Sequence, residues 1–183
     1  MTCRQGVNPA VFFDRDGTLN TSALPGEYIR NPTSLQLLPG AAAAVRQVNN
    51  IGLLAILATN QRWLSEPGVD PNVYSSIELE LGRLLAIHGA RLDASYTCPH
   101  AAYSCHCRKP LPGLLLKAAE DLDVNLSKSY FIGDSTTDAE AGAAVGATTI
   151  LISQQPPSEF NRCANYVVSN IQEAVGLILD VYS

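Results

Sequence analysis

Two carboxylates near the start of the chain are the first candidates for chemistry. Asp14 and Asp16 follow directly on the apolar run 11–13. A short apolar run without alternation is typical of a strand buried on both faces of a parallel sheet. Because ligands of open α/β sheets bind beyond the carboxyl ends of the strands, we expect both carboxylates at the mouth of a site. Their mutual repulsion favours a hard cation such as Mg²⁺, and the alternative is an Asp/Gly-rich turn without chemistry.

Polar groups also follow three further predicted strands, either directly or just beyond them. These groups are Thr59, Asn60, Lys109 and Asp134. Strand ends meet at one edge of a parallel sheet, so we expect the groups to converge there. Hydroxyl, amide and ammonium groups can hold phosphate oxygens, and an aspartate can act as a nucleophile that forms an aspartyl-phosphate. A cation, with Lys109 opposite, would remove the repulsion between that carboxylate and an anionic phosphate ester.

Apolar strand patterns and helical patterns alternate along the chain. We expect strands at residues 11–13, 53–58, 92–96, 130–132, 148–152 and 166–168, and helices at 41–48, 72–89, 112–122, 139–145 and 171–181. This alternation predicts an α/β fold, a doubly wound, Rossmann-like parallel sheet with helices on both faces. A length of 183 residues fits one domain over residues 1–183.

Composition excludes several classes of protein. A net charge of -5 argues against a nucleic-acid partner, which would require a basic face. No apolar run approaches the roughly 20 residues of a membrane span, and the first residues lack the apolar core of a signal peptide. We therefore expect a cytoplasmic protein with no membrane partner.

A second cluster with possible chemistry lies at residues 98–107, where three cysteines and two histidines crowd together. Thiols and imidazoles at this density suit tetrahedral Zn²⁺ in a reducing compartment. We assign Cys98, His100, Cys105 and Cys107 as the ligands, with His106 as the alternative to His100. Four protein ligands would make a closed, structural site that stiffens the loop before Lys109. The competing interpretation is a metal-free loop with incidental cysteines.

Four stretches resemble, in order, the four motifs of the haloacid dehalogenase-like (HAD) phosphatases. They are residues 14–18, 59–61, 108–110 and 133–138. The resemblance implies that Asp14 is the nucleophile and Asp16 the general acid, which later activates water. It also implies that Thr59 and Lys109 bind the phosphoryl group. Asp134 would complete a Mg²⁺ site with the Asp14 carboxylate and the Asp16 backbone carbonyl.

The cysteine-rich loop, which runs directly into Arg108, resembles a subgroup without a large cap. This subgroup holds D-glycero-D-manno-heptose 1,7-bisphosphate phosphatases and related histidinol-phosphate phosphatases. The resemblance implies a Mg²⁺-dependent phosphomonoesterase with a structural Zn²⁺ that removes the 7-phosphate of that heptose bisphosphate. We expect the protein to be a monomer. Histidinol phosphate or another small phosphorylated metabolite is the alternative substrate. An inactive HAD-fold module that binds a phosphosugar or a protein is the alternative of another class.

Substrate selection in a protein without a cap would fall to loops beside the strand ends. We assign Asn60, Gln61, Arg62 and Arg108 as substrate-binding residues. The stretch 62–67 differs from the small, glycine-containing segment usual in the subgroup, and Ser135 stands where the subgroup commonly has lysine. Trp63 is either a loop anchor packed on the core or a platform for a sugar. Arg15 should point away from the two aspartates by strand alternation.

Overall fold

The computed structural model describes residues 6–24, 27–155 and 163–182. All six strands are parallel and lie in the order β3-β2-β1-β4-β5-β6. The strands are β1 (Ala10–Phe13), β2 (Leu54–Asn60), β3 (Ala94–Cys98), β4 (Tyr130–Gly133), β5 (Thr148–Ile152) and β6 (Tyr166–Val168). The helices are α1 (Ala41–Asn50), α2 (Pro71–Ile87), α3 (Gly113–Leu122), α4 (Thr136–Ala143) and α5 (Ile171–Tyr182).

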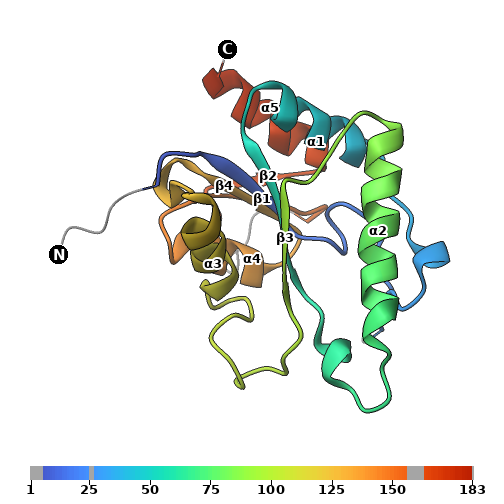
Figure 1. Cartoon of the computed structure of the whole chain (residues 1–183). Helices are drawn as coiled ribbons and strands as arrows, with labels where there is room; N and C mark the ends of the chain where they lie inside the picture. The colour runs from blue at the N-terminus through green and yellow to red at the C-terminus, as the bar shows by residue number, and fades with distance from the viewer. Residues whose placement is uncertain (1–5, 25–26, 156–162, 183) are drawn as a thin grey trace.

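Helices cover both faces of the sheet, as the alternating pattern predicted. Figure 1 shows α1, α2 and α5 on one side and α3 and α4 on the other. Val11 and Phe13 of β1 pack into the core beneath α1, α2 and α5, whereas Phe12 packs into the core beneath α3. All four residues of β1 are buried. The run without alternation is therefore a central strand with apolar contacts on both faces.

The strand order reverses beside β1, which places a binding crevice there. From β1 the chain moves outward to β2 and β3, then crosses to β4 on the other side of β1. The Asp14 N–H donates to the carbonyl of Ile132 across this junction, at 3.0 Å. In sheets of this order, ligands bind at the carboxyl ends of the strands where the order reverses. The residues that follow β1 and β4 therefore flank that crevice.

Most element boundaries differ from the predicted ones by one to three residues, and the differences in β2, β3 and α4 lie next to the site. β2 extends to Asn60 because Thr59 and Asn60 pair in register with Thr97 and Cys98 of β3. β3 accordingly lies two residues further along the chain than predicted. α4 begins at Thr136 rather than 139, because a capping box between Ser135 and Asp138 holds its first turn. Because the residues at these positions are polar, apolar periodicity did not predict the extensions.

The connections agree with the predicted absence of a large cap. Among the described residues, the link from β1 to α1 contains only the 3-10 turn η1 (Pro32–Ser34), and β2 leads to α2 through the 3-10 turn η2 (Arg62–Ser65). No helix in the described ranges combines the length and hydropathy needed to cross a membrane.

Candidate active site

A pocket of about 280 Å³ opens at the carboxyl ends of β1, β2 and β4. Its lining includes five carboxylates and one ammonium group. These groups are Asp14, Asp16, Glu27, Asp134 and Asp138 against Lys109. Such an excess of negative charge in a concave site is unfavourable unless a cation offsets it. The predicted residues Thr59 and Asn60 also line this pocket.

Lys109 is the buried cation at the centre of the site. Its Nζ lies 2.6 Å from Asp14 Oδ1 and 2.6 Å from Asp138 Oδ1, and donates to the carbonyl of Ala58 at 2.8 Å. Burial opposes its charge, but Asp138 and Asp14 outweigh burial and raise the pKa of Lys109. The ammonium therefore stays charged beside the predicted nucleophile.

Asn60 holds the main chain of Lys109 with both ends of its amide. Its Nδ2 donates to the Lys109 carbonyl at 3.0 Å, and its Oδ1 accepts from the Lys109 N–H at 3.1 Å. Asn60 therefore positions Lys109, and because it also borders the pocket its contact with substrate stays a prediction.

Burial and like charge perturb the carboxylates of the pocket. Burial raises the pKa of Asp14 to about 7, with Lys109 opposing and Asp138 adding to the rise. Burial and then Asp138 raise the pKa of Asp134 to about 6. Oxygens of these three aspartates lie within 4.8 Å of one another. A divalent cation bound between them would stabilise the ionised forms, so the donor set fits Mg²⁺.

Asp138 has other partners than an ion. One carboxylate oxygen faces Lys109 Nζ, and the other accepts from the N–H and the hydroxyl of Ser135 at the start of α4. The predicted ligands Asp14 and Asp134 lie together at the pocket, and their role in binding Mg²⁺ stays a prediction.

The Asp16 carboxylate is held by four donated hydrogen bonds. Arg15 donates from Nε and from Nη2, at 3.1 and 2.9 Å, and Asn20 and Gln61 each donate at 2.8 Å. The prediction that Arg15 points away from both aspartates is wrong, because its guanidinium is buried against Asp16. Strand alternation fails here because the chain leaves β1 after Phe13 and turns at Gly17, where φ is +87°.

Gln61 was assigned to the substrate, and the structure contradicts that assignment. Its side chain is fully buried and its amide is bonded to protein on both sides. The amide nitrogen donates to Asp16 and Thr59, and the amide oxygen accepts from Arg15 and Trp63. Gln61 therefore positions other residues of the site.

The loop after Gln61 is anchored rather than open. Trp63 is buried and packs edge-on against the Tyr74 ring at 6.3 Å, which makes it the loop anchor rather than a sugar platform. The neighbouring Arg62 is exposed and is absent from the described lining of the pocket. Its predicted substrate contact is not supported by this position.

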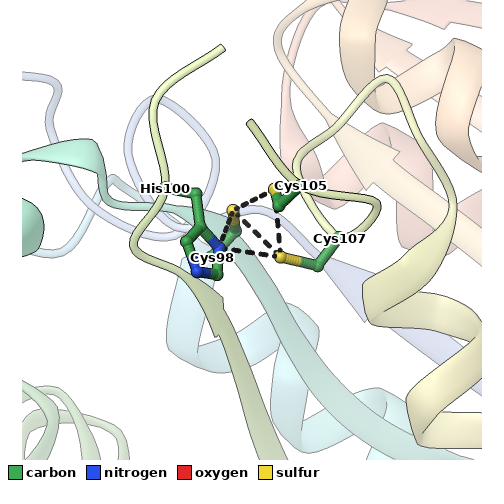
Figure 2. Close-up of side chains that lie close together, drawn as sticks. All are labelled: Cys98, His100, Cys105 and Cys107. Carbon is green, nitrogen blue, oxygen red and sulfur yellow. Dashed lines mark hydrogen bonds between the residues drawn. The ribbon is translucent and has the colours of Figure 1, made fainter. Parts of the chain in front are cut away.

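The four predicted zinc ligands converge at the end of β3, as Figure 2 shows. Cys107 Sγ lies 3.2 Å from Cys98 Sγ, 3.3 Å from Cys105 Sγ and 3.3 Å from His100 Nδ1. Tetrahedral Zn–S bonds of about 2.3 Å would place neighbouring sulfurs roughly 3.8 Å apart. His106 is not part of this cluster.

The thiols of this cluster resist joint ionisation without a cation. Burial and the neighbouring thiols raise the pKa of Cys107 to about 12. Burial also opposes ionisation of Cys105, but hydrogen bonds from Cys107 and from backbone N–H groups lower its pKa to about 6. Three neighbouring thiolates require a metal ion to offset their charge, so these residues fit Zn²⁺.

The comparisons with known proteins agree with this geometry. The HAD-hydrolase-like family model matches residues 106–174. The D-glycero-beta-D-manno-heptose-1,7-bisphosphate 7-phosphatase of Yersinia pestis is 32% identical over 176 residues, which cover 90% of this chain and 92% of that one. The chain belongs to the HAD-like phosphatases. The predicted family is therefore confirmed.

Two further relatives place this HAD-like phosphatase more closely. The D-glycero-D-manno-heptose-1,7-bisphosphate 7-phosphatase of Thermosynechococcus vestitus is 38% identical over 157 residues, covering 79% of this chain and 78% of the other. The crystal structure of D,D-heptose 1,7-bisphosphate phosphatase from B. bronchiseptica, complexed with magnesium and phosphate, superposes with a TM-score of 0.83 at 28% identity. That superposition covers 94% of this chain and 99% of the other.

Some residues of this phosphatase site received no role from the sequence. Asn20 holds the Asp16 carboxylate, and Ser22, Tyr28 and Thr137 line the pocket. Asn20 follows the first motif stretch by two residues, so its place close to Asp16 was the one available signal. Ser22 and Tyr28 lie in a loop segment without periodicity, where composition alone gives no direction to a side chain. Thr137 stands in the fourth motif stretch, where only Asp134 received a role.

Proposed function

We propose that this phosphatase removes the 7-phosphate of D-glycero-D-manno-heptose 1,7-bisphosphate in a Mg²⁺-dependent reaction. The observation that carries the proposal is Lys109 Nζ, held 2.6 Å from Asp14 in a pocket that Asp134 also lines. This arrangement occurs in a chain that spans 92% of a relative named for that reaction.

The chemistry follows from the positions of two aspartates. Asp14 attacks phosphorus and forms an aspartyl-phosphate while Asp16 gives a proton to the departing C7 oxygen. Asp16 then takes a proton from water, which attacks the aspartyl-phosphate, releases inorganic phosphate and restores Asp14. When bound by Asp14, Asp134 and the Asp16 carbonyl, Mg²⁺ supplies the positive charge that lets carboxylate and phosphate approach each other.

Lys109 and Thr59 bind the phosphoryl oxygens. Lys109 already touches the nucleophile, so its ammonium stabilises negative charge that develops on the transferring group. Thr59 borders the same pocket. Phosphoryl transfer depends chiefly on such positioning and charge stabilisation.

A second phosphate would fit beside the first pocket, near Arg108. A neighbouring cavity of about 420 Å³ is lined by Arg108 and Tyr103 and shares Asn60, Lys109 and Thr137 with the catalytic pocket. A planar guanidinium suits bidentate contact with a phosphate. Arg108 is therefore our candidate for the 1-phosphate, whereas Arg62 lines neither cavity in the described part of the chain.

We further propose that Cys98, His100, Cys105 and Cys107 hold a structural Zn²⁺. The support is the convergence of three thiols and one imidazole, with every tetrahedral position filled by protein. Arg108 follows the last ligand directly, and its side chain donates to the carbonyl of His100 at 3.3 Å. We also propose that residues 1–183 form one domain that acts as a cytoplasmic monomer.

The test is release of inorganic phosphate in the presence of Mg²⁺ from a panel of compounds. The panel contains both anomers of the heptose 1,7-bisphosphate, histidinol phosphate, and common hexose and pentose phosphates, with Asp14→Asn protein as the blank. We expect the heptose bisphosphate to show the highest kcat/KM. Preferential turnover of histidinol phosphate or another compound would support the proposed mechanism and exclude the heptose bisphosphate as the preferred substrate. Absence of release from every compound would favour the inactive binding module.

A further inference from the structure

The amide of Gln61 is the best-connected buried polar group in the site. It uses both N–H bonds and accepts two hydrogen bonds, and all four partners are protein side chains. Nε2 donates to Asp16 Oδ2 at 2.8 Å and to Thr59 Oγ1 at 2.9 Å, while Oε1 accepts from Trp63 Nε1 at 2.8 Å and Arg15 Nη2 at 3.1 Å. One side chain thus joins the general acid, the phosphate-binding hydroxyl and the loop anchor.

The orientation of this amide is fixed by its neighbours. The indole of Trp63 and the guanidinium of Arg15 can only donate hydrogen bonds. The atom facing them must therefore be the oxygen, and the atom facing Asp16 and Thr59 must be the nitrogen. A flipped amide would place N–H against two donors and oxygen against a carboxylate. Trp63 and Arg15 are both almost fully buried, so water cannot relieve such a mismatch.

The fixed amide also decides where the proton of Thr59 points. Thr59 Oγ1 accepts from Gln61, and a hydroxyl has one hydrogen of its own. In the described part of the chain, no protein atom accepts that hydrogen, and Thr59 borders the catalytic pocket. The pocket is therefore the place where an acceptor for this hydrogen can bind.

We propose that Gln61 is a positioning residue that presents the Thr59 proton to a phosphoryl oxygen. Because Gln61 accepts nothing from Thr59, the hydroxyl reaches phosphate already oriented as a donor. Trp63 and Arg15 act one step further out by holding the amide in the only orientation that permits this. The inference rests on the proposed function, because it requires phosphate in this pocket.

The experiment is a double-mutant cycle on the affinity for inorganic phosphate with Mg²⁺, measured by calorimetric titration. Gln61→Met removes the donor to Thr59 and should raise the dissociation constant about fivefold, whereas Thr59→Val should raise it about tenfold, the loss of one hydrogen bond. In the Thr59→Val background, Gln61→Met should change it less than twofold. Gln47→Met is the matched control, because it makes the same exchange at an exposed position of α1, and it should stay within twofold.

Each outcome has a separate meaning. Equal effects of Gln61→Met in both backgrounds would show that it acts by general disruption of the site, and would overturn this inference alone. Failure of the unmodified protein to bind phosphate would overturn the proposed function with it. Should Gln61→Met not fold, Gln61→Leu removes the same donor without adding a charge. It should weaken phosphate binding about fivefold alone and less than twofold with Thr59→Val.

Discussion

Replacing Lys109 by methionine tests whether its buried ammonium offsets the charge of the catalytic pocket. Lys109 is 3% exposed and pairs with Asp14 and Asp138, both buried. Removal of one partner from a buried ion pair costs about 3–5 kcal/mol, because the remaining charge stays buried without compensation. We expect Lys109→Met to lower the unfolding free energy by this amount in magnesium-free buffer at pH 8.

The cost should depend on pH, and the sign follows from Asp14. Burial raises the pKa of Asp14 in the folded protein to about 7, above its unfolded value of 3.8, so its contribution to stability falls as pH rises from about 4 to 7. Lys109 lowers the pKa of Asp14, so this pKa should lie above 7 in the Lys109→Met variant. The stability of the variant should therefore continue to decrease as pH rises above 7. The cost of the substitution should grow by about 1.4 kcal/mol per pH unit above 7, until Asp14 ionises in the variant too.

Urea unfolding at pH 6 and pH 8 measures both effects. The matched control is Lys117→Met, because Lys117 pairs with Glu120 and Asp121 on the surface and should change stability by less than about 1 kcal/mol. A similar small loss for Lys109→Met would refute the role of the ammonium. A large loss of stability that is the same at both pH values would show that Lys109 stabilises the fold by packing. It would also show that the ionisation of Asp14 does not contribute to the cost.

Three other predictions concern the nucleophile and the two metals. Asp14→Asn should abolish turnover, and residual turnover would contradict the assignment of the nucleophile. The unfolding free energy at pH 8 should stay equal or increase, because the substitution removes a carboxylate whose pKa burial raises to about 7. Cys105→Ser should lower the bound zinc below one ion per chain and reduce the unfolding free energy by about 3 kcal/mol. An unchanged melting temperature in zinc-free protein would exclude a structural role. Mg²⁺ should raise the melting temperature more at pH 8 than at pH 5, because protons occupy Asp14 and Asp134 at low pH; calorimetry at both values measures this.

The fold was predictable because its signals are local. Buried parallel strands produce apolar runs such as 11–13, and the motif residues mark the strand ends, so the sheet and its helices follow from periodicity. The ends of elements were less accessible. Thr59 and Asn60 belong to β2 because they pair with residues of β3. The sequence of neither strand alone predicts this pairing.

The roles of individual site residues required the tertiary structure. Arg15 reaches Asp16 only because the chain turns at Gly17, and alternation along a strand predicts the opposite direction. Gln61 directly follows two pocket-lining residues, so proximity in sequence suggested substrate contact. Its burial depends on Trp63 and Arg15, which come from different segments of the chain. Residue types predict which chemistry is possible, while contacts between segments decide which residue touches the substrate.

We expect loss of zinc to affect stability more than chemistry, because the proposed zinc site is not the only support of Lys109. Cys98 pairs in register with Asn60, and its carbonyl accepts from the Gln61 N–H at 2.7 Å. Cys107 lies two residues before Lys109. The main chain of Lys109 therefore has two anchors, the zinc loop and the Asn60 amide. In protein that still folds without zinc, the Asn60 anchor persists and keeps the Lys109 ammonium beside Asp14.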